Sequence, residues 1–331
     1  MIKKLVGLIA ISCVLYACTQ QQKKAAGQPV NVIFDTDMGP DYDDVGAITL
    51  LHYYAHQGKA NILATIASTK YDRVGPVLSV LNTYFKQPNI PIAVPKGDAS
   101  PLSDWQKWSD TLVVKYPHQL KSNADAPDAV TLYRQILAKQ PDNSVTIITV
   151  GFFNNIAALL QSKPDEYSPL TGAALIDKKV IKMVSMAGRY PAGQEFNIDE
   201  QAAASNYVFD HWTKPIIFSG YEIGAKINTG LPLINDTTIK NSPVKDVFRI
   251  SIPKAKEDAM GRMSWDQTAV LVGVTGNKPY YRLQRGNIIV DKSGANKWAN
   301  NTTGNHYYLV PIRPAKQVQD VINKLMLYQP E

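Results

Sequence analysis

The sequence predicts an α/β fold with a Rossmann-like open, mostly parallel sheet flanked by helices and an antiparallel hairpin near the C-terminus. Short apolar runs that suit buried parallel strands alternate with longer segments of helical periodicity. The chain has 331 residues, of which 45% are hydrophobic, enough for a large packed core. Residues 29–331 contain no repeat or low-complexity linker, and we interpret them as one domain.

The predicted strands are short apolar runs, whereas the predicted helices have apolar residues three and four positions apart. The strands are expected at Val30–Phe34, Ile62–Ala67, Ile92–Val94, Val145–Val150, Val180–Met186 and Pro215–Phe218. The helices are expected at Val45–Gln57, Val74–Phe85, Ala126–Ala138, Asn155–Gln161, Glu200–His211 and Ala315–Leu327. Alternation in Gly286–Asp291 and His306–Ile312, around a polar turn-rich segment, predicts the hairpin. Gly97–Lys107 and Asn241–Met263 are expected to be long loops at the carboxyl edge of the sheet.

The N-terminus has the pattern of a signal peptide over residues 1–17, with two lysines followed by a short apolar stretch. The string Leu15-Tyr16-Ala17-Cys18 resembles a bacterial lipobox, which implies that Cys18 is lipidated and becomes the mature N-terminus. Residues 18–28 are polar and are predicted to be a flexible tether. The resemblance implies a protein of the bacterial cell envelope, lipid-anchored on the periplasmic or surface side. An ordinary signal peptide or a short anchor is the alternative.

Charge and cysteine content narrow the function classes. The formal net charge is +7, but the lysines are scattered and form no dense stripe, so nucleic acid is not predicted as a partner. Once the leader is removed, Cys18 is the last cysteine, which excludes a disulfide and a cysteine nucleophile. The oligomeric state stays open, with a homo-oligomer as one alternative.

Five aspartates lie within ten residues: Asp35, Asp37, Asp41, Asp43 and Asp44. Ionised carboxylates at this density repel one another, so the fold needs a bound cation, a shared proton or water around them. They lie between the first predicted strand and the first predicted helix, at the edge where open α/β sheets bind ligands. Helix capping and a solvated loop are the alternative, but capping needs fewer acids. The cluster therefore predicts a metal site.

Four segments of the chain together resemble the inosine-uridine preferring nucleoside hydrolase family. The first is Asp35-Thr36-Asp37 with Asp43-Asp44, in which Met38 replaces the proline of the family signature and two residues are inserted. The other three follow in the family's order: the turn Val150–Asn155, Glu195-Phe196-Asn197 and Trp265-Asp266. The matches extend over roughly residues 30 to 270, most of the chain after the leader.

The resemblance implies a calcium site formed by Asp37, Asp44, Asp266 and the backbone carbonyl of Val150. Oxygen donors of this kind suit Ca²⁺, and no Cys/His ligand set competes for zinc. The implied activity is hydrolysis of the N-glycosidic bond of a small-molecule ribonucleoside. A water activated at the ion would lose a proton to the catalytic Asp37 and attack C1′ of the sugar.

The resemblance also implies roles in binding the sugar and the base. Asp43 and Asn197 would hold the ribose hydroxyls, and Glu195 would lie on the 5′-hydroxyl side. Trp265 stands where many pyrimidine-accepting members have a histidine, so its ring would stack on the leaving purine, as in a purine nucleosidase. A position in the hydrophobic core is the alternative for Trp265.

Trp105 and Trp108 are predicted to offer a second stacking face for the base, with packing beneath a loop as the alternative. Arg189 stands where the family often has an asparagine, and it suits a 5′-phosphate or another anionic group. A hydrolase of a modified, anionic ribosyl substrate is therefore one alternative function.

Two further functions remain open at the level of the sequence. A surface lipoprotein could bind ribosyl ligands without cleaving them. A haloacid-dehalogenase-like phosphatase could use Asp35 and Asp37 with magnesium, but the downstream lysine and late acidic pair that it requires are not evident.

Overall fold

The computed structural model describes residues 27–330, so the predicted signal peptide and Cys18 lie outside the described residues. A ten-stranded sheet runs through this part of the chain. Its strands are β1 (Val30–Thr36), β2 (Ala60–Ala67), β3 (Ile92–Ala93), β4 (Val145–Thr149), β5 (Val180–Met186), β6 (Ala192–Gly193), β7 (Ile216–Ser219), β10 (Tyr281–Val290), β11 (Asn296–Ala299) and β12 (His306–Pro311). A separate two-stranded ribbon pairs β8 (Asn228–Thr229) with β9 (Arg262–Met263).

The order of the strands creates the opening at which the site lies. The order is β3-β2-β1-β4-β5-β7-β12-β10-β11-β6, and neighbours from β3 to β12 are parallel. The chain turns outward in opposite directions from β1 and β4, so a crevice forms at the carboxyl ends of these two strands. All six strands predicted from apolar runs overlap strands of this sheet.

The C-terminal strands differ from the predicted hairpin. β10 is longer than expected and pairs along its first half with β12 and along its second half with β11, antiparallel to both. β12 is also parallel to β7, so these strands extend the main sheet. The prediction missed β11 because a strand of four residues in a polar, turn-rich segment has little apolar pattern of its own.

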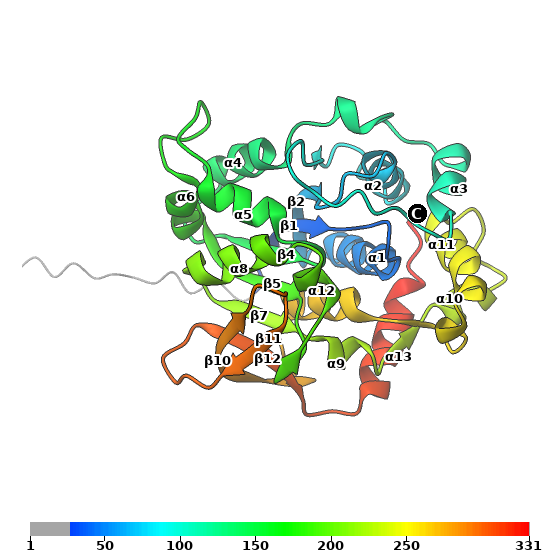
Figure 1. Cartoon of the computed structure of the whole chain (residues 1–331). Helices are drawn as coiled ribbons and strands as arrows, with labels where there is room; N and C mark the ends of the chain where they lie inside the picture. The colour runs from blue at the N-terminus through cyan, green and yellow to red at the C-terminus, as the bar shows by residue number, and fades with distance from the viewer. Residues whose placement is uncertain (1–26, 331) are drawn as a thin grey trace, which may run out of the picture.

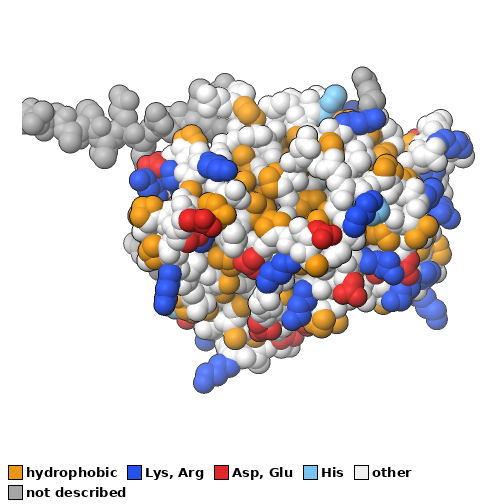
Figure 2. All heavy atoms as spheres, turned by 90° about the horizontal axis from the view of Figure 1, so that it is seen from above, with side chains coloured by type: hydrophobic (Ala, Val, Ile, Leu, Met, Phe, Trp, Pro, Cys, Tyr) orange, Lys and Arg blue, Asp and Glu red, His pale blue; other side chains and the backbone are white. Residues whose placement is uncertain are grey.

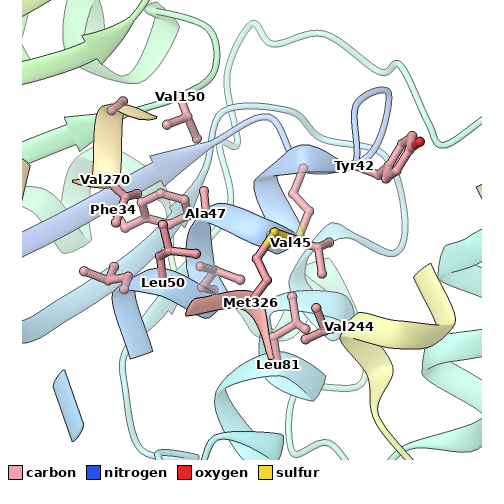
Figure 3. Packing of buried hydrophobic residues seen from close by; sticks show 14 of the residues in the cluster. Phe34, Tyr42, Val45, Ala47, Leu50, Leu81, Val150, Val244, Val270 and Met326 are labelled. Atoms are coloured by element: carbon pink, nitrogen blue, oxygen red, sulfur yellow. The ribbon is translucent and has the colours of Figure 1, made fainter. Parts of the chain in front are cut away.

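Helices cover both faces of the sheet (Figure 1). One face carries α1 (Asp43–His56), α2 (Val74–Tyr84), α12 (Trp265–Thr275) and α13 (Ala315–Met326). The other face carries α4 (Ala129–Lys139), α5 (Asn154–Gln161), α6 (Gly172–Lys179) and α8 (Ala202–His211). Successive side chains of β1 enter opposite cores, Val32 and Phe34 the first and Ile33 the second. Figure 3 shows Phe34 gathered with residues of α1, with Val270 of α12 and with Met326 of α13.

Two predictions about helices need correction. The predicted loop Asn241–Met263 contains α11 (Pro243–Ser251), which begins after the Ser242 cap and is followed by two short 3₁₀ turns. Helix α12, which is buried from Asp266 to Gly273, was not predicted from the sequence. A helix that is apolar on every side has no polar face, so the amphipathic pattern that reveals most helices is missing. The short helices are α3 (Trp108–Lys115), α7 (Phe196–Asp199), α9 (Tyr221–Gly224) and α10 (Leu231–Asn235), with one 3₁₀ turn at Asn123–Asp125.

The surface shows dispersed charge on the face in Figure 2, where Lys and Arg side chains are interspersed with Asp and Glu. Within residues 27–330, no helix has both the length and the apolar character needed to cross a bilayer.

Candidate active site

The loops that follow β1 and β4 meet at the crevice in the sheet. Asp37 follows β1, and Val150 and Gly151 follow β4. A Cβ atom added to Gly151 would lie only 2.3 Å from the backbone nitrogen of Asp37 and 2.8 Å from its Cβ. A glycine at 151 is therefore what allows the two loops to approach each other this closely.

Three carboxylates lie together at this point. Asp43, Asp44 and Asp266 each place a carboxylate oxygen within 4.8 Å of the other two, and all three side chains are buried. Burial raises the pKa of Asp44 and of Asp266 well above the usual range, and the charge of Asp43 raises both further. Helix α12 supplies Asp266 and helix α1 supplies the other two, so the site joins distant parts of the chain.

Asp37 is not in the group of three but belongs to the same electrostatic cluster. Burial raises its pKa well above the usual range, and the charge of Asp44 adds to this. One oxygen of Asp37 and one of Asp44 are buried without a hydrogen-bond partner among the described residues. The other oxygen of Asp44 accepts a hydrogen bond from the Thr36 hydroxyl. A buried carboxylate oxygen without a partner is costly, so this arrangement calls for a cation.

The oxygen donors present suit a hard divalent cation. The carbonyl oxygen of Val150 accepts a hydrogen bond of 2.9 Å from Nδ2 of Asn197 and keeps a second lone pair. This carbonyl and the carboxylates of Asp37, Asp44 and Asp266, the ligands expected from the sequence, offer oxygen atoms only, the donor type that Ca²⁺ or Mg²⁺ prefers. The cluster thus fits a metal ion through its unpartnered oxygens and through the chemistry of its donors.

Arg262, in β9, supplies positive charge that the sequence analysis missed. Its guanidinium pairs with Asp41, lies 3.0 Å from Asp43 and 3.8 Å from Asp258, and its side chain is 10% exposed. No local pattern marks this residue, because its contact with Asp43 joins positions 219 residues apart. Part of the charge compensation for the aspartate cluster therefore comes from the chain itself.

Both oxygens of Asp43 are engaged. Oδ1 accepts hydrogen bonds from Arg262, and Oδ2 accepts them from the backbone amides of Trp265 at 3.0 Å and Asp266 at 3.1 Å. Asp43 therefore caps the N-terminus of α12 from another part of the fold. Asp43, which was predicted to hold ribose hydroxyls, lines the cavity. Its hydrogen bond from the Asp266 amide also positions Asp266.

Replacing Arg262 with methionine should lower the free energy of unfolding by about 3 kcal/mol at neutral pH, measured by denaturant titration of the metal-free protein. The loss arises because Asp43 would be left buried without its ion-pair partner. The exposed Arg282→Met, on β10, is the matched control and should change stability by less than about 0.5 kcal/mol. Equal effects of the two substitutions would contradict this account of Arg262.

The opposite wall of the site contains Glu195 and Asn197. Glu195 caps α7 by accepting a 3.0 Å hydrogen bond from the Asn197 amide, and its other oxygen accepts a 2.9 Å hydrogen bond from the Gly188 amide. Burial raises the pKa of Glu195 to about 7. Nδ2 of Asn197 donates to the carbonyls of Val150 and Met186, so this side chain joins the ends of β4 and β5.

A cavity of about 140 Å³ lies between these walls. Its lining includes Asp41, Asp43, Val150, Met186, Arg189, Gln194, Glu195, Phe196, Asn197, Tyr221, Trp265 and Asp266. Trp265 is half-buried; its Nε1 donates a 2.8 Å hydrogen bond to the Tyr221 carbonyl, and the two rings lie 5.3 Å apart. Phe196 and Tyr221 were not predicted as site residues, although Phe196 lies between Glu195 and Asn197 and Tyr221 follows β7 at the carboxyl edge of the sheet.

Five residues singled out from the sequence are absent from the cavity lining: Asp37 and Asp44, which belong to the carboxylate cluster, and Trp108, Trp105 and Asp35. Trp108 is fully buried in the hydrophobic core, so the prediction that it stacks on a base is wrong. Trp105 is 55% exposed and is not part of the cavity lining. Asp35 lies behind the cavity, where its Oδ2 accepts hydrogen bonds from Tyr133 at 2.8 Å and Asn155 at 3.1 Å, and burial raises its pKa to about 7.

Comparison with known proteins agrees with this architecture. A profile of the inosine-uridine preferring nucleoside hydrolase family matches residues 32–307. A plant nucleoside hydrolase has a similar structure, with 20% identity, a TM-score of 0.67 and coverage of 90% of this chain and 99% of that chain. A purine-preferring ribonucleoside hydrolase from Gardnerella vaginalis has 17% identity, a TM-score of 0.69 and coverage of 89% and 98%.

An inosine-uridine preferring nucleoside hydrolase from Bacillus anthracis has 14% identity, a TM-score of 0.66 and coverage of 90% and 99%. At these identities the solved structures show the fold alone. The sequence matches no curated protein. The family profile, however, extends from β1 to the start of β12 and thus includes both the loops at the crevice and the late aspartate. This chain belongs to the inosine-uridine preferring nucleoside hydrolase family.

Proposed function

We propose that this protein hydrolyses the N-glycosidic bond of purine ribonucleosides with Ca²⁺ as its cofactor, releasing free base and ribose. The observation that carries the proposal is a cluster of buried carboxylates beside a cavity with an aromatic wall. Asp43 and Asp266 of this cluster line the cavity, and Asp37 and Asp44 contribute the unpartnered oxygens. Family membership supports ribonucleoside hydrolysis as the reaction. The choice of calcium and of purine bases is our inference from the residues.

Asp37, Asp44, Asp266 and the Val150 carbonyl would hold the ion. When bound, a calcium ion would supply positive charge to polarise oxygen atoms and coordination positions for the cis-hydroxyls of a ribose. The absence of any cysteine among the described residues, and of histidine from the cavity lining, supports a hard cation.

Asp37 is the proposed general base. Its environment raises its pKa well above the usual range, which makes its carboxylate a stronger base for the proton of the attacking water. The neighbouring carboxylates favour the positive charge that develops on the sugar ring as the glycosidic bond breaks. Asn197 and Glu195, on the opposite wall, would orient the sugar so that C1′ faces the nucleophile.

Trp265 supports the purine preference. Its ring lines the cavity and is held by the hydrogen bond from Nε1 to the Tyr221 carbonyl, so it would lie beside the proposed position of the base. A larger purine ring gains more from such stacking than a pyrimidine does.

Trp265→Ala should slow hydrolysis of inosine about 2- to 12-fold, because stacking contributes about 0.5–1.5 kcal/mol. The rate for uridine should fall less. Trp265→Phe, which keeps an aromatic face, is the matched control and should retain most of the purine preference. Steady-state kcat/KM values for both nucleosides measure the effect, and an unchanged ratio in Trp265→Ala would assign this residue to packing.

The proposed function is tested by incubating the calcium-loaded protein with inosine, guanosine, adenosine and uridine and measuring free base and ribose. We expect base release, fastest from the purine nucleosides and lost after chelation. If no purine ribosyl compound is cleaved by folded, calcium-loaded protein, the proposal is wrong. Tight binding of an unchanged ligand would instead indicate a binding lipoprotein.

The location in the bacterial envelope remains part of the proposal. It rests on the lipobox-like segment that ends at Cys18, which lies outside the described residues. A lipid on Cys18 would tether the catalytic fold to the membrane through the polar residues before β1.

A further inference from the structure

Arg189 follows β5 at the rim of the cavity, and its backbone is fixed by one buried side chain. The Arg189 amide donates a 2.9 Å hydrogen bond to Oδ1 of Asn296, and Nδ2 of Asn296 donates a 2.8 Å hydrogen bond to the Arg189 carbonyl. Asn296, in β11, is 3% exposed. Because one rigid amide group engages both backbone atoms, Arg189 is held in place relative to the cavity.

The side chain of Arg189 is also held. A Cβ atom added to Gly193 would lie 2.5 Å from Cδ of Arg189, so the aliphatic part of the arginine lies directly against this glycine. The guanidinium carbon lies 4.0 Å from the centroid of the Tyr221 ring, and Tyr221 packs in turn against Trp265. Arg189, Tyr221 and Trp265 thus form one continuous wall of the cavity, which ends in a positive charge.

The guanidinium of Arg189 is available to a ligand, in contrast to that of Arg262. Among residues 27–330, no ion pair within 4.0 Å joins Arg189 to a carboxylate, whereas Arg262 contacts three aspartates. Burial raises the pKa of Glu222, and the positive charge of Arg189 only partly offsets this; Oε2 of Glu222 accepts a hydrogen bond from the Tyr190 amide. Arg189 is exposed, and its guanidinium lies over the Tyr221 ring at the rim of the cavity. A guanidinium placed in this way, without an ion-pair partner, is suited to bind an anion.

The two sides of the cavity match the two faces of a ribosyl ring. In a β-ribonucleoside the base and the C5′ group project from one face of the ring, and the 2′- and 3′-hydroxyls project from the other. Asp43 and Asp266 line the cavity at the proposed metal site, where the diol would lie. Trp265, proposed to stack on the base, shares its wall with Arg189. A group on C5′ would therefore point toward the guanidinium.

We propose that the pocket takes purine ribosyl substrates with a phosphate on C5′ and that Arg189 binds this phosphate. This inference rests on the proposed function and narrows its substrate class to nucleoside 5′-monophosphates. The planar guanidinium can donate two parallel hydrogen bonds to phosphate oxygens, which a 5′-hydroxyl cannot accept in the same way. Arg189 acts as a specificity residue. Water adds at C1′ with the help of the groups described above, the glycosidic bond breaks, and the products are the free base and ribose 5-phosphate.

The test compares inosine 5′-monophosphate with inosine as substrates of the full-length, calcium-loaded protein. We expect a higher kcat/KM for the monophosphate. Arg189→Met should lower the ratio of kcat/KM for the monophosphate to kcat/KM for inosine roughly 10- to 100-fold. Arg189→Lys should lower this ratio less, because the positive charge remains. Arg282→Met, which removes an exposed arginine of β10, is the control and should leave the ratio unchanged.

Binding gives a second readout that does not depend on turnover. Calorimetry with ribose 5-phosphate and with ribose should show tighter binding of the phosphate, lost in Arg189→Met. If inosine is cleaved at least as well as its monophosphate, or if Arg189→Met leaves the ratio unchanged, the inference is overturned while the proposed function stands. If neither compound is cleaved, the proposed function fails. In that case calorimetry is the only test of the phosphate-binding role of Arg189. If ribose 5-phosphate binds equally well to Arg189→Met, the inference is overturned.

Discussion

Asp37→Asn should lower kcat by about 10²- to 10⁴-fold while the protein remains folded. Asparagine has nearly the shape of aspartate but cannot accept the proton of the attacking water. The substitution also removes one negative charge from a buried cluster in which the carboxylates raise one another's pKa. The metal-free variant should therefore be at least as stable as the unaltered protein. Rapid-quench measurement of base release gives the effect on catalysis, and thermal unfolding gives the effect on stability.

The control for this substitution is Asp210→Asn, the same chemical change at an exposed position on α8. It should leave both kcat and the melting temperature unchanged. Calcium titration of Asp37→Asn would show whether the ion still binds, so that a lost base can be distinguished from a lost ligand. A variant that binds calcium and turns over at nearly the original rate would show that another group takes the proton.

Removing divalent cations with a chelator should abolish turnover and lower the melting temperature, most strongly at high pH. Calcium at about 100 times its Kd would stabilise the fold by about 2.7 kcal/mol, or about 5 °C. The ligands bind the ion only when they are deprotonated, and burial raises their pKa values. The calcium-induced rise in melting temperature should therefore grow between pH 5 and pH 8.

The direction in which the stability of the metal-free protein changes with pH follows from the direction of these pKa shifts. A carboxyl whose pKa is raised by folding contributes stability below its unfolded pKa, and that contribution is lost as the pH rises through the folded pKa. Asp43, with a pKa raised to about 6 mainly by burial, defines part of this window. The metal-free protein should thus lose stability from these groups as the pH rises, and calcium should restore it.

Two buried histidines change stability with pH in the opposite direction to the carboxylates, so their contribution has to be controlled for. Burial lowers the pKa values of His52 and His306 to about 4, so their contribution to stability is lost as the pH falls from 6.5 toward 4. Comparing melting temperatures with and without calcium at each pH cancels their contribution. Asp44→Asn should reduce the calcium-induced rise, whereas Asp210→Asn should not. A rise that is independent of pH would contradict binding at this cluster.

Much of the fold was predictable because its information is local. Most residues of the apolar runs at the six predicted strands are buried, as in a parallel sheet covered by helices, and each run overlaps a strand of the sheet. The position of the aspartates after β1 also predicted where ligands bind, since the carboxyl ends of parallel strands share one edge. α12 was missed because it is buried on all sides, and α11 was missed because it lies in a segment interpreted as loop.

The details of the site depended on contacts between distant segments. Arg262 reaches Asp41 and Asp43 only because β9 and α12 fold back over the loop after β1. Trp108 and Trp105 are three residues apart, yet one is fully buried and the other is 55% exposed. Nothing in the composition of that segment distinguishes the two residues.

The sequence by itself determined the alternation of strands and helices, the donor chemistry of the aspartates and the segments that identify the family, because these depend on residue type and spacing. Only the tertiary structure decided which carboxylates pair with Arg262 and which keep unpartnered oxygens. It also decided that the guanidinium at the cavity without an ion-pair partner is that of Arg189. Ion pairing, burial and access to ligands depend on distances between residues far apart in the chain, and those distances exist only after folding.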